Sequence, residues 1–418
     1  MSMTPLFSVS GLGSGLDWKK MIDEIMAIER QPVQALEQRK GRLEDVKKAW
    51  TDIETAIRTV DGKLDPLLLN STFQARVATS SSTSVVTASA STGAATGSYA
   101  VEVTALAQAQ VVASDAQADP AAALNLSGTF TINGQAITVV TTDSLLGIRD
   151  KINTTANVGV TASVVDKRLV LKSNSTGTAG EFAVVGDVAQ TLGVINADGT
   201  YKNQLVAAQD AQFKVDGLAL VRGSNTVTDV ISGVTLQLQG VGTSTVEVKA
   251  DVDGMAAKIK DFVNAYNTAL SKLRSYTVKT DPAVPAPLLM GDPTAQGMEG
   301  QLRKLAYEAV AGLAPDMDSL YDIGISTAGR DGQLQVDEAK LRDVLARRPQ
   351  DVATLFSSPT TQSVAEKFRD AFRFWLQAST GLFATREQGI DRQVQGMVER
   401  MRTLEDRLAL RERRLTEQ

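Results

Sequence analysis

The sequence predicts an α+β multidomain protein in which helices from both ends form coiled-coil or helical-bundle legs and two β-rich domains are inserted between them. Three patterns carry this prediction. An apolar heptad runs from Leu36 to Leu67, a second runs from Leu376 to Leu415, and between about residues 75 and 250 the apolar period changes to two. Helical periodicity on both sides of a strand-rich middle indicates that the two end segments form one helical unit.

The N-terminal heptad predicts one long helix with a packed face. Such a stripe is typical of a core-facing helix, and its length favours a coiled coil. Asp65-Pro66 predicts the end of this helix, and Pro32 predicts a break or kink at Gln31. Arg39 is the polar exception in the stripe. The residues of the two seam positions are Leu36, Leu43, Trp50, Ile57 and Leu64, and Val46, Ile53 and Val60.

The C-terminal heptad resembles the N-terminal one. It begins with Leu376 and Phe383, which have the same seven-residue spacing as the seam residues that follow them. No Gly or Pro follows Gly396, and the heptad reaches Gln418 without a stop signal, which predicts that the helix continues beyond this residue. Acidic residues interleaved between Arg400 and Arg414 predict ion pairs along the helix flanks rather than a nucleic-acid-binding arm. Two such helices most economically pair with each other, which places both chain ends at one end of the molecule. The seam residues are Ile390, Met397 and Leu404, and Val394, Met401 and Leu408.

The middle of the chain reads as strands and tight turns. Residues 130–137 and 213–220 each read as strand, two-residue turn and strand, with Asn-Gly in the first turn and Asp-Gly in the second. The shared pattern is either an internal repeat or the same turn chemistry used twice. Residues 144–153 predict a short helix between strands.

These elements predict four domains. Residues 111–204 form an inserted, outermost β-rich domain, because the segments on either side of it both read as strands that would pair. We expect residues 1–35 and the last ~25 residues to be mobile in a free subunit. The other domains are residues 1–38 with 390–418 (terminal coiled coil), 39–74 with 253–389 (helical) and 75–110 with 205–252 (β-rich).

Composition excludes several classes of function. The chain of 418 residues has no Cys and no His, which removes disulfides, cysteine nucleophiles, Ser-His triads and the usual zinc ligands. The net charge of −5 argues against a nucleic-acid partner, because binding to phosphates favours a basic protein. No apolar run is long enough to cross a membrane. We therefore expect a structural protein without cofactor or metal rather than an enzyme. The glycines before the first helix resemble a phosphate loop but have no buried strand before them, so a flexible lead-in is favoured.

Several motifs resemble one known family. The segment Gly11, Leu12, Gly13, Ser14, Gly15, Leu16 and Asp17, followed by the helix that carries Glu29–Pro32, resembles the N-terminal signature of the flagellar filament cap family, hook-associated protein 2. Residues 97–110, 152–173, 211–238 and 262–267 resemble further motifs in the same order along nearly the whole chain. Members of this family usually continue beyond the point where this sequence stops.

The resemblance implies a protein exported through the flagellar type III channel without a cleavable signal. It implies an extracellular place at the flagellum tip, as a ring-like homo-oligomer that helps exported flagellin to fold and insert. The implied partners are further copies of the chain, flagellin, the hook-filament junction protein and a cytoplasmic export chaperone. Two alternatives stay open, namely another hook-associated junction protein, or a surface adhesin that binds host glycans through its exposed β domains.

Overall fold

The computed structural model describes residues 18–417, which form two compact units. One unit combines the chain up to Phe73 with the chain from Val252 onward, and the other is Gln74–Asp251. The helical unit contains α1 (Trp18–Leu64), a 3-10 turn (Pro66–Leu68), α2 (Asn70–Phe73), α5 (Val252–Thr277), α6 (Pro293–Tyr307), β16 (Ile325–Ala328), β17 (Gln333–Val336), α7 (Glu338–Arg347), α8 (Pro349–Phe356), α9 (Val364–Leu376) and α10 (Leu382–Glu417).

The long helix α1 ends where the sequence predicted but passes through Pro32 without interruption. The expected break at Gln31 is therefore wrong. A proline inside a helix removes one backbone hydrogen bond and costs about 3 kcal/mol. Pro32 lies on the exposed face, while Met26 and Val33 beside it are 3% and 7% exposed. Their burial holds the helix together on both sides of the proline.

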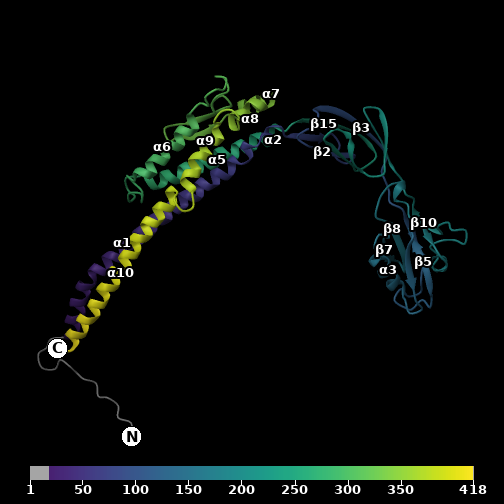
Figure 1. The fold of residues 1–418 in the computed structure, drawn as a ribbon, viewed down its shortest axis with the longest axis horizontal. Coiled ribbons are helices and arrows are strands. Elements are labelled where there is room, and N and C mark those ends of the chain that lie inside the picture. The colour runs from purple at the N-terminus through teal and green to yellow at the C-terminus, as the bar shows by residue number, and fades with distance from the viewer. Residues whose placement is uncertain (1–17, 418) are drawn as a thin grey trace, which may run out of the picture. The chain divides into compact units, whose positions relative to one another are not determined.

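The C-terminal stripe is divided between two helices. Leu376 ends α9 and Phe383 belongs to α10, so the heptad that joins them in the sequence is broken over residues 377–381. Gly381 donates its N–H to the Gln377 carbonyl oxygen at 2.9 Å, and a Cβ on Gly381 would collide with that same oxygen. The chain can fold back this tightly only with glycine at this position. Figure 1 shows α10 then running beside α1.

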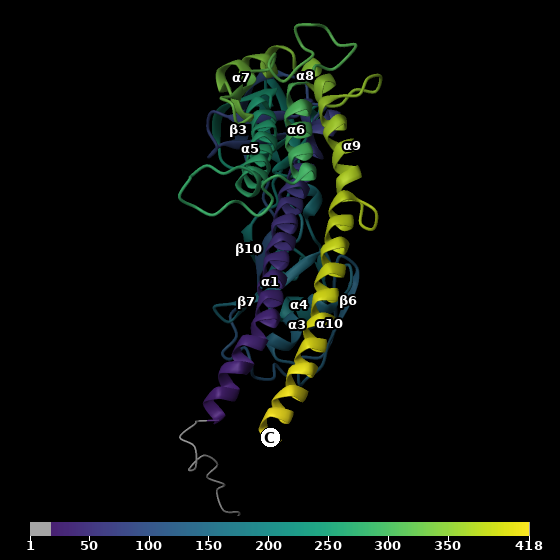
Figure 2. The ribbon, with the colours of Figure 1, turned by 90° about the vertical axis from the view of Figure 1, so that its left-hand side faces the viewer.

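Aromatic rings form the core of the helical unit around α5, α8 and α9. Phe262 on α5 meets Phe368 on α9 edge to face with ring centroids 5.3 Å apart, and Phe356 on α8 stacks on Phe73 at 6.0 Å. Rings of this size bury large apolar areas and add directional contacts. One face of α5 is apolar and buried, and its residues are Ile259, Phe262, Val263, Tyr266 and Leu270. Helix α5 packs against α1, and α6 packs against α5 and α9 (Figure 2).

The second unit is β-rich and has two hydrophobic clusters that share no residue. Around the first cluster lie a five-stranded sheet in the order β1-β15-β3-β11-β12 and a three-stranded sheet in the order β13-β14-β2. Their strands are β1 (Arg76–Ser80), β2 (Val86–Ala90), β3 (Gly97–Ala105), β11 (Ala211–Val215), β12 (Leu218–Arg222), β13 (Thr226–Ile231), β14 (Val234–Leu238) and β15 (Gly242–Ala250).

The other cluster lies wholly between Val112 and Ile195. It is enclosed by a sheet in the order β10-β4-β8-β7, a sheet in the order β6-β5-β9, and α3, whose N-cap is Ser144. Its elements are β4 (Val111–Ala113), β5 (Gly128–Ile132), β6 (Gln135–Val139), α3 (Leu145–Thr154), β7 (Val160–Val165), β8 (Arg168–Ser173), a 3-10 turn (Thr178–Gly180), β9 (Val184–Val185), α4 (Asp187–Thr191) and β10 (Asn203–Val206).

Both predicted hairpins and the predicted short helix are confirmed. The β5–β6 hairpin turns at Asn133 and Gly134, with φ of 51° and 80°, and the β11–β12 hairpin turns at Asp216 and Gly217, with φ of 51° and 84°. Positive φ at both central residues defines a type I′ turn, which matches the twist of the flanking strands.

Candidate functional site

The seam between α1 and α10 is the feature in which the two ends of the chain meet. The helices run antiparallel, and ion pairs fix their register. Lys47 Nζ lies 2.7 Å from Asp391 Oδ1, and Arg30 Nη2 lies 3.2 Å from Glu412 Oε2. The hydrogen bond to Asp391 raises the pKa of Lys47, although both side chains remain accessible to solvent. The predicted pairing of the two terminal helices is therefore confirmed.

The half of the seam nearest the aromatic core is tightly packed. Trp50 is 1% exposed, its ring meets Phe383 edge to face at 6.0 Å, and the Arg386 guanidinium lies 5.7 Å from its centroid. Both contacts add to apolar burial, because an aromatic ring attracts a nearby cation and a second ring packed edge to face. The predicted seam residues that are buried are Trp50, Ile53, Ile57, Val60, Leu64, Ile390 and Met397.

The distal half of the seam is only partly buried. There α1 and α10 face each other without a third helix, so most seam side chains keep one edge in water, although Met26 and Val33 are buried. Val33 is buried in this half although neither predicted seam position included it, because a helix of 3.6 residues per turn drifts relative to a strict seven-residue repeat. The predicted seam residues that are partly buried are Leu36, Leu43, Val46, Val394, Met401, Leu404 and Leu408.

A groove of about 410 Å³ runs along one flank of this distal half. The apolar residues Val33 and Leu408 and the acidic residues Glu37 and Glu405 are among those that line it. Arg30 and Glu412, which form the ion pair across the helices, also line it. The groove is lined by more acidic than basic residues, and it lies entirely within the helical unit.

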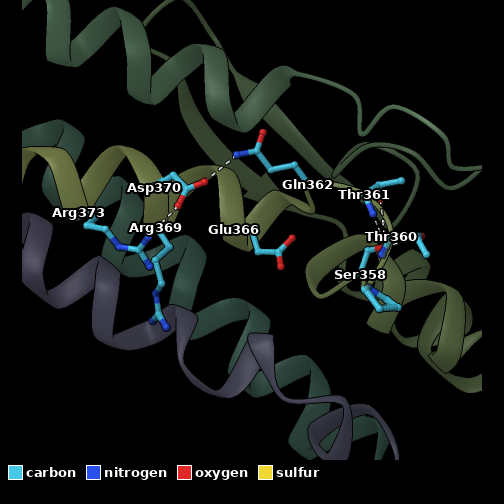
Figure 3. Close-up of a pocket in the computed structure, with 9 residues that line it drawn as sticks. Ser358, Thr360, Thr361, Gln362, Glu366, Arg369, Asp370 and Arg373 are labelled. Atoms are coloured by element: carbon cyan, nitrogen blue, oxygen red, sulfur yellow. Dashed lines mark hydrogen bonds and ion pairs between the residues drawn. The ribbon is translucent and has the colours of Figure 1, made fainter.

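A polar cleft of about 430 Å³ on α9 and the turn before it does not have the properties of a reactive site (Figure 3). Asp370 accepts a hydrogen bond from Gln362 at 2.8 Å and pairs with Arg373. Glu366 closes the capping box with Ser363 at the start of α9. The charged groups of the cleft are thus occupied by hydrogen bonds and ion pairs with one another. They cap the start of α9 and form surface ion pairs.

Other kinds of site are also missing from residues 18–417. Within that range, no cluster of three or more acidic residues is arranged to hold a metal ion, and no helix combines the length and apolar character needed to span a bilayer. The glycine-rich segment Gly11–Asp17 lies outside the described residues.

Comparisons with known proteins agree across the chain. The family model of the flagellar hook-associated protein 2 N-terminus matches residues 14–110, that of the C-terminus matches residues 208–418, and the flagellin hook IN motif matches residues 129–175. A-type flagellar hook-associated protein 2 of Pseudomonas aeruginosa is 30% identical over 392 residues, covering 84% of this chain and 81% of that protein. Flagellar hook-associated protein 2 of Escherichia coli K12 is 28% identical over 439 residues, covering 98% and 92%.

A solved structure shows the same architecture. The crystal structure of the D1-D2-D3 domains of the Escherichia coli flagellar cap protein FliD matches with a TM-score of 0.64 and 30% identity. The match covers 82% of this chain and 99% of that structure. Long terminal helices packed together and β-rich domains between them are thus features shared with a solved relative.

Proposed function

Because this chain belongs to the flagellar hook-associated protein 2 family, the flagellar cap proteins, we propose that it promotes the folding and insertion of exported flagellin at the filament end and prevents loss of flagellin to the medium. Membership of this family makes it a structural protein of the flagellum tip and not an enzyme. The proposed action uses the terminal helices as movable legs and the β-rich unit as part of an oligomeric plate. Its partners in this proposal are further copies of the chain, flagellin, the hook-filament junction protein and an export chaperone.

The gradient of burial along the α1–α10 seam is the observation that supports this proposal most directly. Ile53, Ile57 and Val60 are 0% exposed and anchor the leg in the helical core. Leu404 and Leu408 keep part of their apolar surface in water. Burial of apolar surface contributes about 25 cal/mol per Å². A partner helix that covers the exposed apolar surface of the distal seam would therefore gain binding free energy. The buried half of the seam meanwhile keeps the leg attached to the helical core.

Complementation of a strain that lacks its own cap protein tests the proposal. Leu43→Asp with Trp50→Asp, or Met397→Asp with Leu404→Asp, should stop filament growth at a normal level of export, and flagellin should accumulate in the medium. Leu410→Asp is the matched control, because Leu410 lies on the same helix and is 56% exposed. Full-length filaments with either seam variant would show that the legs do not act as proposed.

The seam experiment does not test the role of residues 111–204. We propose that these residues are a domain of their own that contributes to the plate. A chain without them should keep partial motility if the seam is the part that acts on flagellin.

A further inference from the structure

We propose that the two flanks of the distal leg bind each other between neighbouring copies of the chain, the arginine flank of one copy against the acidic groove of the next. This inference rests on the proposed function, since it describes how copies of the cap arrange their legs. It starts from charged side chains that have no partner within the subunit.

The arginine flank consists of Arg39 on α1 and Arg400, Arg407 and Arg414 on α10. All four side chains are exposed, and no ion pair or hydrogen bond joins any of them to another residue between 18 and 417. Sequence analysis predicted helix-flank ion pairs for this stretch. The prediction is confirmed for Arg411, which pairs with Glu29 at 2.8 Å, and is wrong for the other arginines of the stretch, which are Arg400, Arg402, Arg407, Arg413 and Arg414.

Helical geometry places these arginines on one side of the seam. Arg400, Arg407 and Arg414 are seven residues apart and recur on one face. Taking Leu404 as the seam direction, Arg407 lies about 60° to one side, and Glu405 lies about 100° to the other. The same construction on α1 puts Arg39 on the arginine side of Val33 and Glu37 on the side of the groove.

The register of the helices brings like charges to one level. Lys47 pairs with Asp391 and Arg30 pairs with Glu412, so Arg39 falls beside the part of α10 that carries Arg400. Two guanidinium groups at one level repel each other unless an anion lies between them. Ile28, which is 64% exposed, continues the same flank toward Arg414 and adds an apolar contact point.

The opposite flank supplies the complement. The groove is lined by Glu37 and Glu405, and neither carboxylate forms an ion pair within residues 18–417. A face that attracts a different face of the same molecule gives a head-to-tail contact, and repetition of such a contact closes into a ring when the rotation permits. Opposite charge on the two flanks therefore suits lateral contact between identical legs better than face-to-face pairing.

The first test uses charge reversal and mixing of full-length chains. R400E/R407E makes both flanks acidic, and E37K/E405K makes both flanks basic. We expect each variant alone to associate at least about tenfold more weakly than wild type in sedimentation velocity at low salt, and an equimolar mixture to reassociate. R402E/R413E is the matched control, since it makes the same change of charge on the outward face of α10 and should associate like wild type.

The absence of cysteine allows a second, geometric measurement. Ile28→Cys on the arginine flank and Ala409→Cys in the groove lie on opposite sides of one leg. Oxidation should therefore join different copies into a ladder of covalent multimers. The ladder should disappear when R400E/R407E is added and persist with R402E/R413E.

Several results would overturn the inference. These are unchanged association of both flank variants, failure of the folded variants to reassociate when mixed, or equal loss in the outward-face control. Normal association of R400E/R407E together with lost filament growth would assign the arginine flank to flagellin and leave the capping function standing. Failure of the wild-type chain to complement a cap-deficient strain would refute the capping function itself, and the mixing result would still decide the contact between legs.

Discussion

The burial gradient along the seam predicts that two substitutions of equal size have very different costs. Ile57→Ala and Leu408→Ala both remove three carbon atoms from a seam side chain. Ile57 is 0% exposed in the packed half, so its truncation leaves an enclosed cavity and should cost about 3–4 kcal/mol. Leu408 is partly exposed and lines an open groove, so its truncation should cost only about 1–2 kcal/mol.

The chain offers a selective probe for this measurement. All three tryptophans, Trp18, Trp50 and Trp375, belong to the helical unit, so their fluorescence during urea unfolding follows this unit alone. Neither substitution removes a tryptophan. Native-state hydrogen exchange should show the same order, with amides of the distal halves of α1 and α10 exchanging faster than those around Ile57.

Function should follow the opposite order from stability. Leu408→Ala should impair filament growth although the subunit stays folded, because the surface offered to a partner is reduced. Ile57→Ala should leave growth intact wherever the remaining stability keeps the unit folded. Equal costs of unfolding for both substitutions would show that the seam is packed uniformly in the free subunit, and the reasoning about movable legs would fail.

Three further predictions concern other parts of the chain. The hydrogen bond from Tyr276 Oη to Asp52 Oδ2 at 2.6 Å, with burial and the carboxylate charge, raises the pKa of Tyr276 to about 12. This stabilisation is present below the unfolded pKa near 10 and is lost as pH rises toward 12, so Tyr276→Phe should cost about 1 kcal/mol at pH 8 and progressively less at higher pH in urea titrations. Asn133→Ala should destabilise the β-rich unit by about 2–3 kcal/mol in thermal unfolding followed by circular dichroism, since it places Ala at φ of 51° and removes bonds to Val158 O and Ala183 N; Asn133→Gly should cost less because glycine adopts this φ freely. Replacement of residues 111–204 by a short Gly-Ser linker should leave cooperative unfolding of the remaining chain, because the two clusters of the β-rich unit share no residue, and a chain that no longer unfolds cooperatively would contradict this boundary.

Period and turn chemistry made much of the fold predictable. Seven-residue spacing located the long helices because a buried stripe must recur at nearly that interval. Asn-Gly and Asp-Gly located two hairpins because few residues other than Gly, Asn and Asp tolerate positive φ at both central positions. These signals are local, and each depends on the backbone preference of a few residues.

The features that sequence reasoning missed depend on tertiary packing. The break before α10 arises from the close approach of Gly381 to the Gln377 carbonyl, and the heptad continues in the sequence across it. The uninterrupted passage of α1 through Pro32 depends on the burial of its neighbours against α10. The unpaired arginines could not be told from paired ones, because only the register of the two helices decides which acidic residue each one meets.

The antiparallel seam also has a mechanical consequence. Tension applied between the distal ends of α1 and α10 acts across the seam rather than along it. The helices therefore separate by unzipping, one layer of contacts at a time from the distal end. The contacts of Met26 and the Arg411–Glu29 and Arg30–Glu412 pairs yield first, followed by Val33 and the partly exposed leucines. The load reaches Trp50 and Phe383 only after those contacts have opened. Such sequential opening needs little force at each step and stops at the aromatic core, which acts as a mechanical clamp.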